Sequence, residues 1–343
     1  MRSKQNVFLG LENIAGIFTS LKKGFEQNDI PADFYSLSEH IYGYETDRVI
    51  KYSNNSFIRK FQKSFLLLKL LFNYKYFIFD STGSLLPGFR DIKLFRLFGK
   101  KTMVIFTGCD IRLPEKVEQF QWNPCRECTD NYKNFVGCVL ATKPEKVKII
   151  EDKFDLIACA EETAGALSRK YYPTLFPIDV EKFKYAGTNP GKRLKILHAP
   201  SNPEYKGTRY IITAIEKLQS EFDFEFNIVK DVKAEDLYRE IERSDLIIDQ
   251  MLVGFYGLFS IEAMAMGKPV VCYIREDILK NSPDDMPVIN ADPDTLYDVL
   301  KEILSSPNKL IQVGNNSRSY VERYHDAKII SEQYYKLLEG EIN

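Results

Sequence analysis

Short apolar runs alternate with segments of helical periodicity along almost the whole chain. In residues 13–25 and again in Tyr210–Leu218, apolar side chains recur every three or four positions, which is typical of one face of a helix. The strand-like runs are Val7–Gly10, Phe34–Leu37, Tyr76–Asp80, Thr102–Thr107, Leu156–Ala160, Leu194–His198, Glu225–Val229, Leu246–Asp249, Val270–Tyr273 and Val288–Asn290. Strands that alternate with helices predict an α/β fold with mostly parallel sheets and crossover helices.

The chain is long for a single hydrophobic core, because 343 residues normally divide into two domains. Prolines at 173 and 177 and the glycine- and proline-containing turn 187–191 separate the first series of strands from the second. We therefore predict an N-terminal domain of residues 1–178, a C-terminal domain of residues 179–320 and a C-terminal helix of residues 321–343, with the boundary inside 177–192.

Composition restricts the classes of partner. The chain is 44% hydrophobic and 28% charged with a net charge of −1, so it has no basic excess with which to bind nucleic acid as its main partner. Residues 1–6 are polar and lead directly into a strand-like run, unlike a secretory signal. The longest apolar run, Phe65–Phe72, is interrupted by Lys69 and is too short to span a bilayer. These features predict a cytoplasmic protein.

The most informative segment is Gly254–Val271, which follows the apolar run Asp245–Asp249. It predicts a buried strand, a glycine turn, a helix that carries Glu262, a helix end at Gly267 and a further strand. A helix N-terminus after a glycine turn presents free N–H groups to an anion, and a carboxylate further along can accept hydrogen bonds from a sugar diol. The segment therefore predicts a site for a nucleotide that carries a diphosphate and a ribose. The alternative is an ordinary βαβ unit with a capping glycine.

Together with His198–Thr208, this segment resembles the GT-B glycosyltransferases, particularly the family-4-type enzymes of bacterial polysaccharide and glycolipid assembly. The resemblance covers most of the chain. It implies two Rossmann-like domains with parallel sheets that face a central cleft, and a nucleotide-sugar donor bound mainly by the second domain. It leaves open whether the C-terminal helix crosses back to the first domain.

The resemblance implies that Lys206 binds the donor diphosphate, where a lysine and helix N–H groups stabilise the leaving group without a metal. It implies that Glu262 binds the ribose, and we expect Lys206→Ala and Glu262→Ala to weaken donor binding and leave the fold intact. Its full set of donor contacts is Gly10, Gly16, His198, Lys206, Gly207, Thr208, Tyr256, Gly257, Leu258 and Glu262. The alternatives are a solvated surface lysine at Lys206 and a packed core side chain at His198.

Two positions of the second domain depart from the family pattern. Gly254 stands where the family has the first of two glutamates, which usually touches the transferred sugar, and Pro200 stands where an arginine usually precedes the lysine. Tyr256 and Gly257 still match the glycine-turn portion, so contacts through backbone N–H groups remain part of the prediction.

In the first domain, Thr107–Arg112 resembles the family motif Gly-Ser-Asp-Ile-Arg, with Thr107 in place of the usual preceding histidine. The resemblance implies that Asp110 and Arg112 complete the catalytic cleft, because a loop after a strand faces the crevice in open α/β sheets. The alternative is a structural pair that holds the loop. The turn Gly10–Gly16 matches the first strand–helix turn of the family.

Four of the six cysteines lie close together in the sequence: Cys109, Cys125, Cys128 and Cys138. A Cys-x-x-Cys with two further thiols has the ligand count of a structural zinc site. Reduced thiols and a disulfide are the alternatives. No cofactor is expected to be required for catalysis.

The segment Arg59–Phe72 mixes basic and large apolar residues. One interpretation is an interfacial helix that touches anionic lipid at the inner face of the plasma membrane. The other is a helix that faces the core and carries a few solvated lysines.

These observations predict a hexosyltransferase that moves a sugar from a nucleoside-diphosphate-sugar to a glycan or lipid-linked acceptor in cell-surface polysaccharide assembly. The resemblance implies retention of the anomeric configuration. A non-catalytic sugar-nucleotide-binding subunit is the first alternative, because of Gly254 and Thr107. A dehydrogenase or epimerase is disfavoured, since no Gly-x-Gly-x-x-Gly follows the early strands. The nucleotide base, sugar, acceptor, linkage and oligomeric state are left open.

Overall fold

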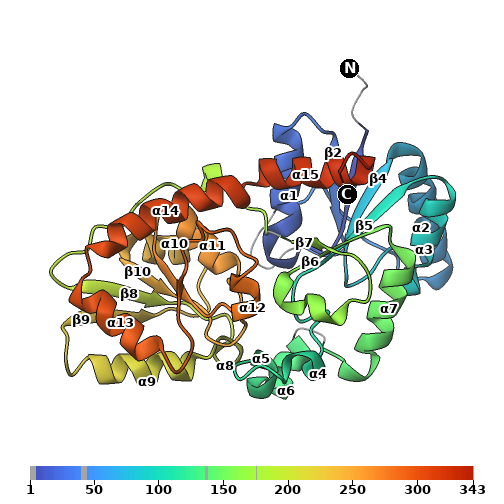
Figure 1. The fold of residues 1–343 in the computed structure, drawn as a ribbon. Helices are drawn as coiled ribbons and strands as arrows, with labels where there is room; N and C mark the ends of the chain where they lie inside the picture. Colours follow the sequence, from blue (N-terminus) through green and yellow to red (C-terminus); the bar gives the residue numbers. More distant parts are fainter. Residues whose placement is uncertain (1–4, 40–44, 136–137, 175, 343) are drawn as a thin grey trace. The chain divides into compact units, whose positions relative to one another are not determined.

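The computed structural model describes residues 5–39, 45–135, 138–174 and 176–342, and it divides the chain into two compact units (Figure 1). Unit 1 comprises residues 1–113, 136–179 and 326–343, and unit 2 comprises residues 114–135 and 180–325. Each unit contains one parallel sheet with helices packed on it, so the predicted α/β class is confirmed. Among the described helices, none is long and apolar enough to cross a membrane.

The sheet of unit 1 has seven strands in the order β3-β2-β1-β4-β5-β6-β7, all parallel. They are β1 (Val7–Leu11), β2 (Ala32–Ser36), β3 (Arg48–Val49), β4 (Tyr76–Asp80), β5 (Lys101–Phe106), β6 (Leu156–Cys159) and β7 (Tyr172–Pro173). The five apolar runs predicted in this half are all strands. The two edge strands β3 and β7 were missed, because two residues are too few to show an alternating pattern.

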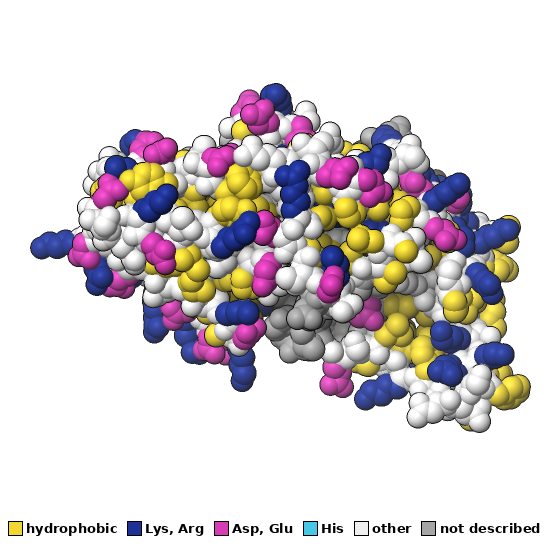
Figure 2. Space-filling view, turned by 90° about the horizontal axis from the view of Figure 1, so that it is seen from below, with side chains coloured by type: hydrophobic (Ala, Val, Ile, Leu, Met, Phe, Trp, Pro, Cys, Tyr) yellow, Lys and Arg dark blue, Asp and Glu magenta, His cyan; other side chains and the backbone are white. Residues whose placement is uncertain are grey.

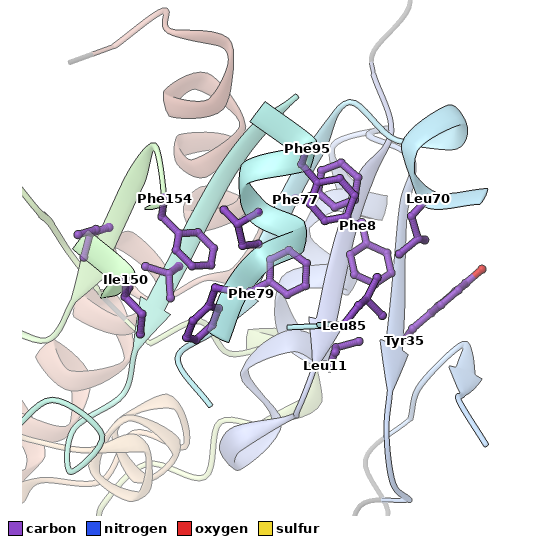
Figure 3. Close-up of a cluster of buried hydrophobic side chains, with 14 of the residues drawn as sticks. Phe8, Leu11, Tyr35, Leu70, Phe77, Phe79, Leu85, Phe95, Ile150 and Phe154 are labelled. Atoms are coloured by element: carbon purple, nitrogen blue, oxygen red, sulfur yellow. The ribbon is translucent and has the colours of Figure 1, made fainter. Parts of the chain in front are cut away.

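Helices cover both faces of this sheet. Leucines of α2 (Ser56–Asn73) join Ile92 and Phe95 of α3 (Arg90–Leu97) and Ile150 of α7 (Lys143–Lys153) in one core cluster with Phe8 and Phe77 (Figure 3). Side chains alternate between the two faces of a strand. Phe34 and Tyr76, which are next to the cluster residues Tyr35 and Phe77, therefore point to the opposite face of the sheet.

On that opposite face, Phe34 contacts Phe18 of α1 (Ile17–Gln27), with ring centroids 5.7 Å apart. Tyr76 contacts Tyr335 of α15 (Ala327–Glu339) at 5.5 Å. The C-terminal helix therefore packs in unit 1, which answers a question that the sequence left open.

The sheet of unit 2 has five parallel strands in the order β12-β11-β10-β8-β9. They are β8 (Leu194–His198), β9 (Phe224–Ile228), β10 (Leu246–Ile248), β11 (Val270–Cys272) and β12 (Ile289–Asn290), which confirms all five predicted strands. The helices are α8 (Pro203–Lys206), α9 (Thr208–Leu218), α10 (Ala234–Arg243), α11 (Leu258–Ala265), α12 (Glu276–Leu279), α13 (Leu296–Ser305) and α14 (Lys309–Tyr324). A core cluster joins α9 and α13 to β8 and β10.

Residues 114–135 belong to unit 2, although the sequence analysis assigned them to the first domain. They form α4 (Pro114–Val117), α5 (Pro124–Glu127) and α6 (Asp130–Phe135). Glu127 accepts a hydrogen bond of 2.5 Å from Arg209, and the Trp122 and Tyr210 rings lie 5.2 Å apart. Periodicity could not reveal this, because three short polar helices without a strand carry no pattern that selects one core over another.

Candidate functional site

The candidate site in unit 2 lies at the carboxyl ends of its central strands. His198 ends β8 and pairs with Ile248, which ends β10, so the loops that follow these two strands leave the sheet side by side. The loop after β8 carries Lys206 and Gly207, and the loop after β10 carries Asp249 and leads to α11. Ligands of open α/β sheets bind at this edge.

Lys206 is buried, at 7% exposure, which excludes the solvated-lysine alternative. Its ammonium donates a hydrogen bond of 2.6 Å to Asp249 Oδ1. The other oxygen, Asp249 Oδ2, accepts a hydrogen bond of 2.5 Å from the hydroxyl of Ser260, in the first turn of α11. A lysine ammonium has three N–H donors, so an anion at the start of α11 could be bound while the pair with Asp249 is kept.

Glu262 lies two residues after Ser260 on α11, about 3 Å further along the helix axis at 1.5 Å per residue. It is half-buried, and one of its oxygens accepts a hydrogen bond of 3.3 Å from the Tyr238 hydroxyl of α10. Burial raises the pKa of Glu262 to about 7, against the hydrogen bond from Tyr238 and the charge of Lys182, which lower the pKa. Lys206 and Glu262, assigned from separate segments, therefore both lie at α11, with Ser260 and Glu262 about 200° apart around the helix axis.

We expect Glu262→Gln to change the pH dependence of stability. The pKa of this carboxyl is near 4.5 when unfolded and about 7 when folded, so the unfolding free energy falls as the pH rises from about 4.5 to 7. Glutamine keeps the hydrogen bond from Tyr238 and carries no charge. The variant should be more stable than the wild type by about 3 kcal/mol at pH 8 and nearly equally stable at pH 4. Urea unfolding at both pH values measures this, and a difference that is independent of pH would contradict it.

His198 is fully buried, and both ring nitrogens are used inside the unit. Nδ1 lies 2.8 Å from the Ile248 carbonyl and Nε2 lies 2.8 Å from the Thr208 hydroxyl. Since a carbonyl only accepts, Nδ1 carries the hydrogen and Nε2 accepts from Thr208. Burial lowers the pKa of His198 to about 4, so the ring is neutral. The structure supports the packed alternative: His198 and Thr208, both predicted donor contacts, join the end of β10 to the start of α9.

The two glycines of these loops have left-handed backbone conformations. Gly207, between α8 and α9, has φ +75°, and Gly254 has φ +85°. A Cβ at Gly254 would lie 3.2 Å from Cγ and Cδ of Arg275. The position at which the resemblance expects a glutamate is thus one where a side chain is strained and the space is already taken.

Arg275, which follows β11, was missed by the sequence analysis. Its guanidinium donates two hydrogen bonds of 2.8 Å to Asp277 and lies 4.0 Å from the centre of the Phe120 ring. An arginine shortly after a buried strand is the signal that could have drawn attention to it. The side chain is buried beside Gly254.

The turn before α11 divides into a buried part and an accessible part. Tyr256 is buried, and its hydroxyl lies 3.0 Å from both the Tyr320 hydroxyl and His325 Nε2. Gly257 and Leu258 are half-exposed at the first turn of the helix. Of the predicted contacts in this turn, the structure therefore leaves Gly257 and Leu258 open to a ligand and gives Tyr256 a packing role.

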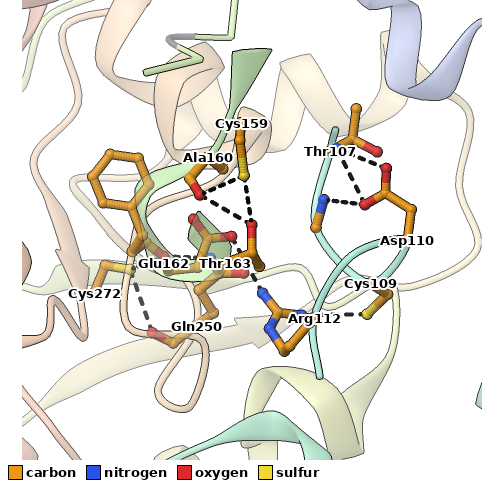
Figure 4. A network of polar contacts seen from close by, with 12 residues as sticks. Thr107, Cys109, Asp110, Arg112, Cys159, Ala160, Glu162, Thr163, Gln250 and Cys272 are labelled. Atoms are coloured by element: carbon orange, nitrogen blue, oxygen red, sulfur yellow. Dashed lines mark hydrogen bonds and ion pairs between the residues drawn. The ribbon is translucent and has the colours of Figure 1, made fainter. Parts of the chain in front are cut away.

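In unit 1, Asp110 and Arg112 have separate partners (Figure 4). The carboxylate of Asp110 accepts hydrogen bonds from the backbone N–H groups of Thr107 and Gly108, at 3.0 and 2.7 Å, and from the Ser81 hydroxyl. Arg112 is 2% exposed and forms an ion pair of 3.2 Å with Glu162. These contacts favour the loop-holding alternative over the predicted catalytic role.

The first turn of unit 1 is held by a carboxylate that the sequence analysis missed. Asp80, at the end of β4, is buried and accepts hydrogen bonds from the N–H groups of Leu11 and Glu12, at 3.1 and 3.0 Å. Burial and the charge of Asp80 raise the pKa of Glu12. Of the two predicted glycines in this turn, Gly16 has φ +78° at the start of α1. At Gly10, a Cβ would lie only 2.9 Å from the Phe8 ring, so the position has no space for a side chain.

Unit 1 also contains a cleft of about 480 Å³ beyond the carboxyl ends of β1, β2 and β3. Three cations line it: Lys51 after β3, and Arg59 and Lys63 of α2. Such a lining suits an anionic group.

The four clustered cysteines are divided between the units. Cys109 and Cys138 belong to unit 1, where they accept hydrogen bonds from Arg112 at 3.3 Å and from Lys143 at 3.0 Å, and Cys125 and Cys128 belong to unit 2. All six cysteines lie in the described part of the chain, and none is in a disulfide. No three His, Cys, Asp or Glu residues among those described are grouped to hold a metal ion, and the zinc site stays a prediction.

No protein-family model matches the sequence, and no curated protein matches it significantly. Solved structures do match over almost the whole chain. HepE of Anabaena, solved with UDP-glucose, is 13% identical with a TM-score of 0.62, and 98% of this chain covers 99% of HepE. A glycosyltransferase of Rickettsia africae is 11% identical with a TM-score of 0.66, at 98% and 99% coverage. The sucrose-phosphate synthase of Thermosynechococcus elongatus is 14% identical with a TM-score of 0.64, at the same coverage. At these identities the likeness establishes the fold, which is GT-B.

Proposed function

We propose that this GT-B chain is a glycosyltransferase that moves a hexose-type sugar from a nucleoside-diphosphate-sugar to an acceptor hydroxyl. The observation that carries the proposal is the buried cation Lys206, paired with Asp249, which in turn accepts a hydrogen bond from Ser260 in the first turn of α11. A buried lysine beside a helix N-terminus is suited to a diphosphate, because both offer N–H donors and positive charge.

The same arrangement suits the chemistry of transfer. When the bond between the sugar and the diphosphate breaks, negative charge grows on the leaving diphosphate. Lys206 and the N–H groups at Gly257 and Leu258 would stabilise that charge without a metal ion. Glu262, when ionised, would accept hydrogen bonds from the ribose hydroxyls. Since HepE was solved with UDP-glucose, we infer a uridine donor.

The acceptor side of the proposal rests on unit 1. The cleft lined by Lys51, Arg59 and Lys63 would hold an acceptor that carries an anionic group, such as a lipid-linked or acidic glycan. The likeness to WaaG, described as a glycosyltransferase involved in lipopolysaccharide biosynthesis (14% identical, TM-score 0.54, 98% and 100% coverage), is in keeping with cell-surface polysaccharide assembly. Retention of configuration is inferred from the family resemblance.

A non-catalytic nucleotide-sugar-binding protein is the second candidate. Gly254 favours it, because its left-handed backbone strains any side chain and a Cβ there would press on the Arg275 side chain. The two candidates share the donor site and differ in turnover.

We expect UDP and UDP-sugars to stabilise the protein and NAD(P) to leave its melting temperature unchanged. At a nucleotide concentration of about 100 Kd, binding adds about 2.7 kcal/mol, which corresponds to a rise of about 5 °C. Thermal shift with a panel of UDP, GDP, ADP and NAD(P) species measures this. Stabilisation by NAD(P) alone, or by no nucleotide, would overturn the donor assignment.

Turnover separates the two candidates. Incubation of the protein with UDP-sugars and a mixture of glycan and lipid-linked acceptors should release free UDP if the protein is a transferase. A protein that is stabilised by UDP-sugars yet releases no UDP would be the binding protein.

A further inference from the structure

Helix α2 is apolar on two opposite faces. Leu66, Leu67, Leu70 and Leu71 are buried against the sheet of unit 1. On the other side, six large apolar side chains are 48–84% exposed: Phe57, Ile58, Phe61, Phe65, Leu68 and Phe72. At 100° per residue these six fall within an arc of about 100°, which makes them one continuous stripe. Single exposed apolar residues are ordinary, but a contiguous stripe marks a surface that is covered in use.

The charges of α2 are all positive. Arg59, Lys60, Lys63 and Lys69 lie between Ser56 and Asn73, and this segment has no Asp or Glu. At the same 100° per residue, Lys60 and Lys69 lie on the two sides of the apolar stripe. Lys60 and Lys69 therefore flank the stripe on the exposed side of α2, whereas Arg59 and Lys63 lie on the side of the helix that lines the cleft.

The apolar surface continues past the end of α2. Leu97 and Phe98, at the end of α3, are 74% and 63% exposed. Lys75, just after α2, donates a hydrogen bond of 2.8 Å to the Gly99 carbonyl, which joins the ends of the two helices. Figure 2 shows apolar side chains interspersed with lysines and arginines on the surface at the end of unit 1 that carries α2 and α3.

We propose that the exposed face of α2 docks on an anionic phospholipid bilayer, with the Phe57–Phe72 stripe at the acyl boundary and the basic residues among the lipid phosphates. A helix with one apolar face bordered by cations lies in the interface plane, and anionic headgroups attract each cation. A second copy of this chain suits the face less well, because pairing α2 with itself would bring like charges together along the seam. An acidic protein partner is an outcome of the test below.

Docking would also bring the basic cleft within one helix diameter, roughly 10 Å, of the headgroups, because Arg59 and Lys63 of the same helix line the cleft on the side away from the stripe. An amphiphilic acceptor held in the bilayer could then enter the cleft from the membrane. This consequence rests on the proposed function, whereas the docking itself does not.

The test is co-sedimentation of the full chain with phosphatidylcholine vesicles, with and without phosphatidylglycerol. We expect binding to the anionic vesicles that weakens as salt is raised, and at least about tenfold weaker binding to neutral ones. Phe61→Ser with Phe65→Ser should weaken binding to anionic vesicles by about tenfold or more, and Lys60→Ser with Lys69→Ser by a similar factor. Ile311→Ser, which removes an exposed apolar residue of α14 in unit 2, is the matched control and should bind as the wild type does.

Each variant is also melted with and without UDP, so that loss of fold or of nucleotide binding is seen separately from loss of docking. The proposal is overturned by equal binding to neutral and anionic vesicles, by no binding, or by unchanged binding of the phenylalanine variant. Two further outcomes would overturn it. One is self-association of the wild type that the Phe61/Phe65 variant loses. The other is wild-type binding to an acidic polypeptide, such as polyglutamate, in preference to vesicles, if the same variant loses that binding.

Discussion

Lys206→Ala is expected to lower the free energy of unfolding of unit 2 by about 3 kcal/mol or more, and to abolish stabilisation by UDP. Lys206 and Asp249 are both buried, with side chains 9% and 1% exposed. Removal of the cation leaves a buried, uncompensated carboxylate, which still accepts a hydrogen bond from the Ser260 hydroxyl. The structure therefore changes the expectation from sequence, in which the loss of Lys206 would affect donor binding alone.

A paired replacement separates the two effects. Lys206→Met with Asp249→Leu removes both charges and should recover most of the lost stability, yet it should still show no thermal shift with UDP. Lys309→Ala breaks an exposed ion pair with Glu302 and should change stability by less than about 1 kcal/mol. Urea unfolding and thermal shift measure both quantities. A Lys206→Ala protein as stable as the wild type would show that the buried pair is not formed.

Gly24→Ala should destabilise unit 1 by about 3 kcal/mol, although alanine is normally the better helix former by about 1 kcal/mol. Gly24 lies in α1, and a Cβ there would be 2.0 Å from the Ala327 carbonyl oxygen and 2.3 Å from its carbon. Both atoms are backbone, so α1 and α15 would have to separate. Asn28, which donates a hydrogen bond of 2.7 Å to the Lys328 carbonyl, would lose that contact as well.

The control is Gly165→Ala, because no atom lies within 4 Å of a Cβ at Gly165. This variant should unfold at nearly the urea concentration of the wild type. Hydrogen exchange of the α15 amides should rise in Gly24→Ala and stay slow in the control. If Gly24→Ala were stabilising, as helix propensity alone predicts, α15 would not pack against α1 as the structure has it.

Most of the fold could be predicted from the sequence, because it depends on local periodicity. Ten strand-like runs became strands, since an apolar run between helical segments is buried in a parallel sheet whatever its partners are. Periodicity says less about which face of a segment is covered. In α2 both faces are apolar, so the sequence left the core-facing and membrane-facing interpretations open, and the structure shows one side packed on the sheet and the other side exposed.

The sequence predicted which residues belong to the candidate site, whereas the contacts among them are known only from the structure. Lys206 and Glu262 were found because a lysine before a glycine and a glutamate in the helix after a glycine turn follow recognisable strand ends. The partners that set their chemistry are distant or unmarked: Asp249 lies 43 positions from Lys206, and Tyr238 lies 24 positions from Glu262. His198 and Tyr256 also matched the family's donor-binding segments, but both side chains are buried and have packing roles.

The sequence by itself therefore determined the fold class, nearly all strands and the segments that could bind a diphosphate. Only the tertiary structure decided which side chains are buried, that residues 114–135 pack with unit 2, and that the last helix packs on the first. The reason is physical. Strand and helix patterns arise from neighbouring residues, whereas ion pairs, close backbone contacts and exposed faces depend on residues that only packing brings together.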